Sequence, residues 1–191
     1  QEYAARFGFE PERNPAYLTL ALGAGATNPL QMAGAYAVFA NGGYRVSPYL
    51  ISKVTDSDGK VLSEARPARA GDEANRVIDA RNAFLMDSML KDVVRHGTAN
   101  KAMALKRTDL AGKTGTTNDS IDAWFAGYNP NVVGIAWIGY DQPKNLGNKE
   151  TGGGLALPIW IGYMSKALKG EPVEERVVPG GLINVNGEYF Y

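Results

Sequence analysis

Apolar residues recur at helical spacing in three stretches of the sequence. The spacing predicts helices over residues 28–40, 79–96 and 157–168. Gly97 and Gly170 are the expected stop signals of the second and third helices. The pattern therefore distributes long helices over the early, middle and late parts of the chain.

Local signals refine two of these helices. Asn28 can cap the first helix, Pro29 suits its first position, and Gln31 can complete a capping box. The expected apolar side of the second helix is formed by Met86, Met89, Leu90 and Val93. We expect both of these methionines to lie in the core.

The region between the first two helices has the pattern of a hairpin. Residues 44–55 are rich in strand-forming side chains, and Pro48 marks an edge or a bulge. Asp58-Gly59 is a turn signal, so residues 60–62 are the expected returning strand. Residues 64–78 are polar, and we expect them to be irregular.

Three further strands are predicted at residues 110–116, 123–128 and 132–140, with a tight turn at 129–131. Because they are consecutive, we expect an antiparallel meander. Three glycines at 152–154 suggest a flexible joint before the last helix. The predicted fold class is α+β, an antiparallel sheet with packed helices.

Composition excludes several classes of protein. The chain has 191 residues, and its 20 basic and 20 acidic side chains give a formal net charge of zero, which argues against a nucleic-acid binder. The absence of cysteine excludes disulfides and Cys-based zinc sites. No apolar run reaches the ~20 residues of a membrane span, and no signal peptide is present.

Both ends of the sequence lack the signals of natural termini. Residues 1–7 resemble the end of a helix closed by Gly8, and the chain stops abruptly at Tyr191. We therefore expect a piece of a longer protein.

The strand around Lys113 carries the candidate chemistry. Side chains alternate along a strand, so Lys113 and Gly115 share one face, and Thr114 and Thr116 share the other. Glycine at 115 permits close approach to the backbone. A cation with nearby hydroxyls suits a carboxylate ligand, and an exposed strand can pair with a peptide. The Lys-Thr-Gly tripeptide alone is a weak signal, expected by chance in roughly a few per cent of chains this long.

Its surroundings are more specific. The run Lys113 to Asp119, followed by Asp122 to Tyr128, closely resembles class A (bifunctional) penicillin-binding proteins. The resemblance extends over most of residues 1–170. Further matching segments are Ala21–Gly25, Thr27–Ala33, Tyr36–Gly43, Met89–Val94 and Gly97–Ala99.

The resemblance implies the fold of penicillin-binding proteins and serine β-lactamases, and a D,D-transpeptidase that cross-links peptidoglycan stem peptides through an acyl-serine. Lys113, Thr114 and Gly115 would then be catalytic, and Thr116, Thr117 and Asn118 would bind substrate. Lys113 would stabilise charge and bond to the family's second motif. The Thr116 hydroxyl would bind the terminal carboxylate of the substrate, and its backbone N–H would form half of the oxyanion hole. No cofactor or metal is implied.

The resemblance also implies partners and a location. The expected ligands are stem peptides ending in D-Ala-D-Ala and β-lactams, on the periplasmic side of the bacterial inner membrane. Residues 1–170 would be the C-terminal portion of the transpeptidase domain, and residues 171–191 an extension. The nucleophilic serine and the second motif would lie upstream, in a part of the same protein absent from this chain.

The sequence contains two Ser-x-x-Lys matches that could supply a nucleophile. Ser57 and Lys60 lie across the predicted hairpin turn, which offers no helix N-terminus to activate a serine. Ser88 and Lys91 are followed by Thr98-Ala99-Asn100, which resembles the second motif. However, Ser88 is predicted in mid-helix, where backbone N–H groups are already used. The favoured interpretation is a surface serine and a solvated lysine.

Other candidates have structural interpretations. Residues 111–114 imitate a phosphate loop, but Arg107 stands where the first glycine should be and a strand follows. His96 suits the end of a helix. Asp119 and Asp122 could be general bases, but capping of turns is the interpretation we favour. The aromatic residues Trp124, Phe125, Trp137 and Trp160 are interpreted mainly as packing.

The sequence leaves two alternative functions open. One is a carboxypeptidase or a β-lactamase of the same superfamily. The other is a non-catalytic module that senses β-lactams or binds the cell wall. The residues that precede this segment in the parent gene would discriminate among them.

Overall fold

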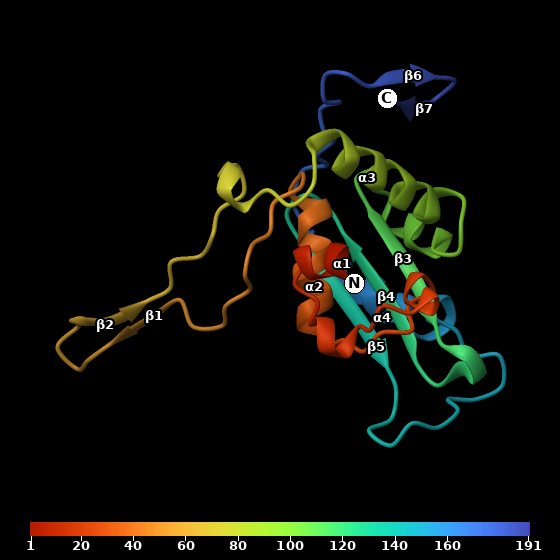
Figure 1. Cartoon of the computed structure of the whole chain (residues 1–191), viewed down its shortest axis with the longest axis horizontal. Coiled ribbons are helices and arrows are strands. Elements are labelled where there is room, and N and C mark those ends of the chain that lie inside the picture. Colours follow the sequence, from red (N-terminus) through yellow and green to blue (C-terminus); the bar gives the residue numbers. More distant parts are fainter.

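The chain folds into three layers around a small sheet, in a computed structural model that describes all residues from Gln1 to Tyr191. The sheet contains β3 (Ala111–Thr116), β4 (Ala123–Tyr128) and β5 (Val133–Ile138) in that order. Helices α2 (Pro29–Ala40) and α3 (Ala80–Arg95) pack on one side, and α4 (Leu157–Ala167) lies behind the sheet (Figure 1). The predicted α+β fold with an antiparallel sheet is confirmed.

The sheet is the expected meander. In β3 and β4, Lys113 lies opposite Ala126, and Thr116 opposite Ala123. Asn129 shapes the turn into β5, because its Oδ1 accepts hydrogen bonds from the backbone N–H groups of Asn131 at 3.2 Å and Val132 at 2.8 Å. A short local turn therefore fixes the pairing of the last two strands.

The two faces of the sheet bury different apolar clusters. The cluster toward α2 and α3 contains Ala40, Leu90, Ala111 and Tyr128. The cluster toward α4 includes Leu110, Phe125, Ala136, Leu157, Trp160 and Met164. Consecutive strand residues alternate between these clusters, as the period of two requires.

Glycines in the sheet allow α4 to approach closely. The Trp160 ring packs against Phe125, with 4.9 Å between ring centroids. A Cβ on Gly127 or Gly134 would lie 2.9 Å and 2.8 Å, respectively, from the Trp160 indole. The large indole therefore requires glycine at both positions.

Helix α2 begins as predicted but lacks a full capping box. The Asn28 side chain accepts a hydrogen bond from Gln31 N at 2.9 Å. The Gln31 side chain does not return to the cap, because its amide donates to Glu10 Oε1 at 2.9 Å. Only half of the predicted box is therefore formed.

Helix α3 is rotated relative to its predicted apolar side. Met89 is 61 % exposed, so its assignment to the core is wrong. The buried positions are Ala83, Phe84, Asp87, Leu90, Lys91 and Val94. The physical reason is that an acidic and a basic side chain occupy the buried side, which apolar spacing alone does not reveal.

The predicted strand over 44–55 is mostly irregular. Only β1 (Lys53–Thr55) pairs with β2 (Val61–Glu64), across a turn in which Gly59 has φ +80°. Upstream, Tyr44 forms a single bridge with Arg76. Pro48 has no N–H to donate and lies in a groove with α2. The hairpin, called the arm from here on (residues 52–65), projects away from the body (Figure 1).

The remaining elements are short. Helix α1 (Glu2–Arg6) is followed by Gly8 with φ +98°, as expected for a closing glycine. No helix in the structure has both the length and the apolar character needed to cross a membrane. The other short elements are η1 (Pro11–Arg13), η2 (Leu18–Leu22), η3 (Glu73–Asn75), η4 (Asn100–Leu105), η5 (Asn118–Ser120) and η6 (Gly152–Ala156).

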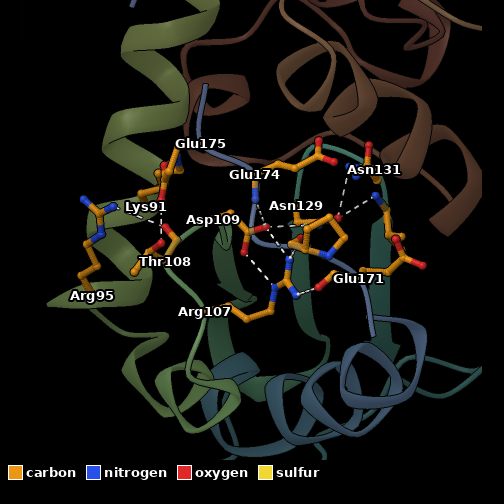
Figure 2. Close-up of polar contacts among 12 residues, drawn as sticks. Lys91, Arg95, Arg107, Thr108, Asp109, Asn129, Asn131, Glu171, Glu174 and Glu175 are labelled. Carbon is orange, nitrogen blue, oxygen red and sulfur yellow. Dashed lines mark hydrogen bonds and ion pairs between the residues drawn. The ribbon is translucent and has the colours of Figure 1, made fainter. Parts of the chain in front are cut away.

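The chain after α4 folds back across the body. Residues 171–176, called the strap, lead to a final hairpin of β6 (Ile183–Val185) and β7 (Glu188–Phe190). The buried Arg107 guanidinium holds the strap by donating to the carbonyls of Glu171 at 2.8 Å and Pro172 at 2.6 Å (Figure 2). Asp109 pairs with Arg107 at 2.6 Å and accepts from Glu174 N at 3.2 Å.

A second polar anchor contradicts the prediction of a solvated Lys91. This lysine is buried, and its Nζ lies 3.3 Å from Asp87 Oδ2 and 2.8 Å from Glu175 Oε2. Glu175 also accepts a hydrogen bond from Thr108 at 2.6 Å (Figure 2). Lys91 is therefore a structural link between α3 and the strap.

Candidate functional site

Four of the six predicted site residues lie on β3, which is one of the two edge strands of its sheet. Lys113 is exposed, Thr114 and Gly115 are half-buried, and Thr116 is exposed. The first two residues of β3, Ala111 and Gly112, are buried, whereas none of the last four is. The strand emerges from the core where the predicted chemistry begins.

The unpaired edge of β3 presents backbone groups of the threonines. Thr117 N donates to Asp122 O at 3.1 Å, so odd-numbered residues turn their N–H groups toward β4. In an antiparallel pair the direction alternates with each residue, so the N–H groups of Thr114 and Thr116 point to the open edge. These N–H groups can meet a substrate carbonyl or an added peptide strand.

Lys113 is a cation without an acidic partner. Its Nζ donates to the carbonyl of Thr114 at 2.8 Å, and it takes part in none of the ion pairs of the chain. Its only side-chain hydrogen bond therefore folds it over the open edge. An anionic group at this edge would meet an uncompensated positive charge.

Gly115 lies next to an aromatic pair. A Cβ at Gly115 would come within 3.2 Å of Trp124 Cβ, so glycine keeps the strand close to this side chain. The rings of Trp124 and Trp137 are 5.9 Å apart, and Trp137 Nε1 donates to Asp122 Oδ1 at 2.9 Å. Asp122 thus holds an indole in place, which favours its predicted structural role over that of a general base.

The Thr114 hydroxyl contacts the loop after α3. Its Oγ1 lies 2.6 Å from the Oγ1 of Thr98, so one hydroxyl donates to the other. Helix α3 ends at Arg95. This contact joins the end of α3 to the candidate strand. Thr98 was not among the predicted site residues, although it lies in a segment that carries the family resemblance.

The Thr116 hydroxyl contacts the turn before α4. Gly152 N donates to Thr116 Oγ1 at 3.1 Å. The three glycines are not an irregular joint as predicted, because all three belong to the π-helical turn η6, which continues into α4. Thr151 caps this turn by accepting from Gly154 N at 3.1 Å.

The remaining two predicted residues lie beyond the strand. The Thr117 hydroxyl accepts hydrogen bonds from Ile121 N at 3.1 Å and Asp122 N at 2.7 Å, so it shapes the turn into β4. Asn118 is exposed at the start of η5, and Asp119 follows with φ +57°. Thr117 and Asn118 therefore both lie in a tight turn that is held by local hydrogen bonds.

The internal candidates for a nucleophile have no supporting geometry. Ser88 lies in the middle of α3, and its hydroxyl has no hydrogen bond to a base. Ser57 lies in the arm, all of whose strand residues are exposed. His96 is exposed at the C-cap of α3. No group of three His, Cys, Asp or Glu side chains could hold a metal ion.

The arrangement can bind an anionic group and polarise a carbonyl group, but it contains no activated nucleophile. A free cation, an exposed hydroxyl and an outward N–H group lie within four residues of β3. Such a combination suits a carboxylate and a developing oxyanion.

Comparison with known proteins gives one family. Residues 6–162 match the family described as the penicillin binding protein transpeptidase domain. Over 190 residues the chain is 52 % identical to penicillin-binding protein 1A of Neisseria lactamica, and over 228 residues it is 42 % identical to that of Pseudomonas aeruginosa. The two alignments include 100 % and 96 % of this chain, but only 24 % and 28 % of the respective relatives.

Solved structures agree. The crystal structure of penicillin-binding protein 1A from Haemophilus influenzae matches 95 % of this chain, and 32 % of its own, with a TM-score of 0.88 and 36 % identity. The penicillin-binding protein PonA1 from Mycobacterium tuberculosis matches 84 % of this chain, and 44 % of its own, with a TM-score of 0.72 and 30 % identity.

Proposed function

Because the chain belongs to the penicillin binding protein transpeptidase domain family, we propose that it supplies one wall of the active site of a peptidoglycan D,D-transpeptidase. The observation that carries this proposal is the open edge of β3, where the free Lys113 cation lies beside outward N–H groups. Since the chain spans about a quarter of its curated relatives, the proposal concerns the longer protein.

The proposed reaction divides the work between this wall and a serine outside the chain. The serine oxygen attacks the carbonyl between the two terminal D-alanines, the C–N bond breaks, and the terminal D-alanine leaves with a proton. The amine of a second stem peptide then attacks the acyl-serine, forms the new amide and releases the serine hydroxyl. A β-lactam would acylate the same serine by opening its ring.

The residues of β3 have distinct proposed roles. The Thr116 N–H stabilises the oxyanion, a contribution typically worth ~2.7–4 kcal/mol in the transition state. Lys113 stabilises negative charge and bonds to a second motif outside the chain. The Thr116 hydroxyl binds the terminal carboxylate, while Thr114 and Gly115 form the strand surface along which the peptide extends.

Thr117 and Asn118 are proposed to border the bound peptide from the turn. The hydrogen bonds of the Thr117 hydroxyl fix this turn beside Thr116. We place the reaction on the periplasmic side of the inner membrane, where peptidoglycan is assembled. Residues 1–170 would belong to the domain, and residues 171–191 would be its extension.

Labelling with a fluorescent penicillin tests the proposal. The full-length protein should form a covalent adduct, and Lys113→Ala should slow its formation by about 10²–10³-fold, the range typical for loss of one charge-stabilising group. The isolated 191-residue chain should form none. An unlabelled full-length protein, or an unchanged rate in Lys113→Ala, would contradict the proposed function.

A further inference from the structure

A backbone group in the turn before α4 contacts the exposed side chain at the end of β3. Gly152 N donates to Thr116 Oγ1 across 36 positions of sequence. A hydroxyl has one hydrogen to donate and two lone pairs that accept. Because an amide N–H can only donate, this contact uses a lone pair of Thr116 and leaves its hydrogen free.

The hydrogen of the Thr116 hydroxyl has no acceptor within the chain. Thr116 is exposed, and its hydroxyl forms no other hydrogen bond in the structure. The hydrogen therefore points away from Gly152, toward the space outside the strand. A carboxylate can only accept, so a hydroxyl fixed as a donor is the partner that it needs.

The position of Gly152 is itself tightly fixed. It is buried, and a Cβ there would lie 2.3 Å from the carbonyl oxygen of Trp124 and 2.4 Å from that of Gly115. Both obstacles are backbone atoms of the sheet, so they cannot swing aside. At the end of the turn, Ala156 and Leu157 are fully buried and anchor it in the core.

From these contacts we infer that Gly152 is a positioning residue for carboxylate recognition. Its N–H holds the Thr116 hydroxyl as a donor toward the terminal carboxylate of the stem peptide or β-lactam. The inference rests on the proposed function and assigns specificity to a glycine that acts through the Thr116 side chain. Any larger residue at 152 would push on the peptide group that joins Gly115 to Thr116 and would spoil this orientation.

Two probes that differ only in the carboxylate test the inference. Acylation rates of the full-length protein are measured with a fluorescent penicillin and with its methyl ester. The quantity compared among variants is the rate with the penicillin divided by the rate with its methyl ester, called the ratio below. A general structural defect slows both probes alike and leaves the ratio unchanged. Loss of carboxylate recognition lowers the ratio.

The expected ratios follow from the hydrogen bonds. Thr116→Val should lower the ratio by about 10- to 100-fold, the usual effect of losing a hydrogen bond to a charged group. Thr116→Ser should keep most of it. Gly152→Ala should lower the ratio toward that of Thr116→Val, and the double variant should fall no further, because both changes remove one interaction. Gly162→Ala is the control, since a Cβ there meets open space.

A second variant tests the inference if the Gly152→Ala protein does not fold. Thr151→Val removes the cap of the turn without adding bulk at 152, and it too should lower the ratio. A wild-type ratio in Gly152→Ala, or in Thr151→Val where the first does not fold, overturns the inference and leaves the proposed function intact. A wild-type protein that reacts with neither probe overturns both.

Discussion

Trp160 joins the sheet and α4 through a single side chain. It is 1 % exposed, contacts Phe125, and donates from Nε1 to Gly127 O at 3.3 Å. Two glycines leave room for its ring. Its packing therefore sets the distance between α4 and the strands, and with it the position of the turn that reaches Thr116.

Removing this side chain should destabilise the domain strongly. Trp160→Ala should cost about 3–5 kcal/mol of the free energy of unfolding, because it leaves a cavity in the core between the sheet and α4. Tyr163→Ala on the same helix is the matched control, since Tyr163 is 56 % exposed. Calorimetry of the full-length protein should show a large fall in the melting temperature for the first variant only. Equal falls would contradict the assignment of Trp160 to the core.

Ser88 provides a residue-scale test of where the nucleophile lies. It occupies the middle of α3 without a hydrogen-bonded base. Ser88→Ala should therefore leave penicillin labelling of the full-length protein within about twofold of wild type. Loss of labelling in this variant would move the nucleophile into this chain.

The sequence predicted the positions of some residues in the fold but not those of others. Lys113 and Thr116 were predictable because a strand places alternate side chains on fixed sides, and local spacing is enough for that. The burial of Lys91 was not, because its partner Glu175 lies 84 positions away. The close contacts of Gly152 with the sheet were not predictable, since a glycine run does not show which backbone approaches it.

At the scale of elements, the strap is held by charges rather than by apolar packing. Burial alone would raise the pKa of the Asp109 carboxyl, but hydrogen bonds from Arg107, Glu174 N and Asn129 outweigh it and lower the pKa. In Glu175, hydrogen bonds from Lys91 and Thr108 likewise outweigh burial, and the pKa is lowered. Both carboxylates are therefore stabilised in the folded state.

The strap should loosen in acid. Carboxylates with lowered pKa values stabilise the fold above their unfolded values of about 4, and this contribution is lost as the pH falls through the lower folded values. Hydrogen exchange, corrected for intrinsic rates, should show falling protection of residues 171–176 below about pH 4. The amide of Leu168, bonded to the carbonyl of Met164, is the control and should keep its protection. Constant protection of the strap would refute the charge-based account.

The buried arginine should dominate this anchor. Arg107→Met leaves the Asp109 carboxylate buried without its partner, which typically costs about 3–5 kcal/mol. Arg13→Met is the control, because Arg13 and Glu10 form an exposed pair worth roughly 0–1 kcal/mol. Exchange of residues 171–176 should rise sharply in the first variant and stay unchanged in the second. Similar exchange in both would show that the strap is held elsewhere.

Most elements were predictable from local signals. The cap at Asn28, the turn at Asn129 and the period of two located α2 and the meander. The prediction of a strand over residues 44–55 was wrong for most of that range, because strand propensity does not supply a pairing partner. Only residues 53–55 find one, across the turn at Gly59.

At the scale of the whole molecule, the arm is an appendage of the layered body. All residues of β1 and β2 are exposed, and Ala65 N donates to Ser52 O at 2.9 Å, so the two ends of the arm are adjacent. Replacing residues 53–64 by two glycines should therefore change the free energy of unfolding of the body by less than about 0.5 kcal/mol. Calorimetry of the full-length protein measures this. A large loss would mean that the arm packs on a part of the protein outside residues 1–191.

The open edge of β3 has a consequence for handling the protein. An edge that accepts a peptide strand can also accept the edge of another copy, which is a route to aggregation. Lys113 is the only charged side chain on Ala111–Thr116, so it also protects solubility. Light scattering should show that Lys113→Ala aggregates faster than wild type, whereas Lys113→Arg does not. The residue proposed to act on a substrate would thus also keep β3 from pairing with the β3 edge of another copy.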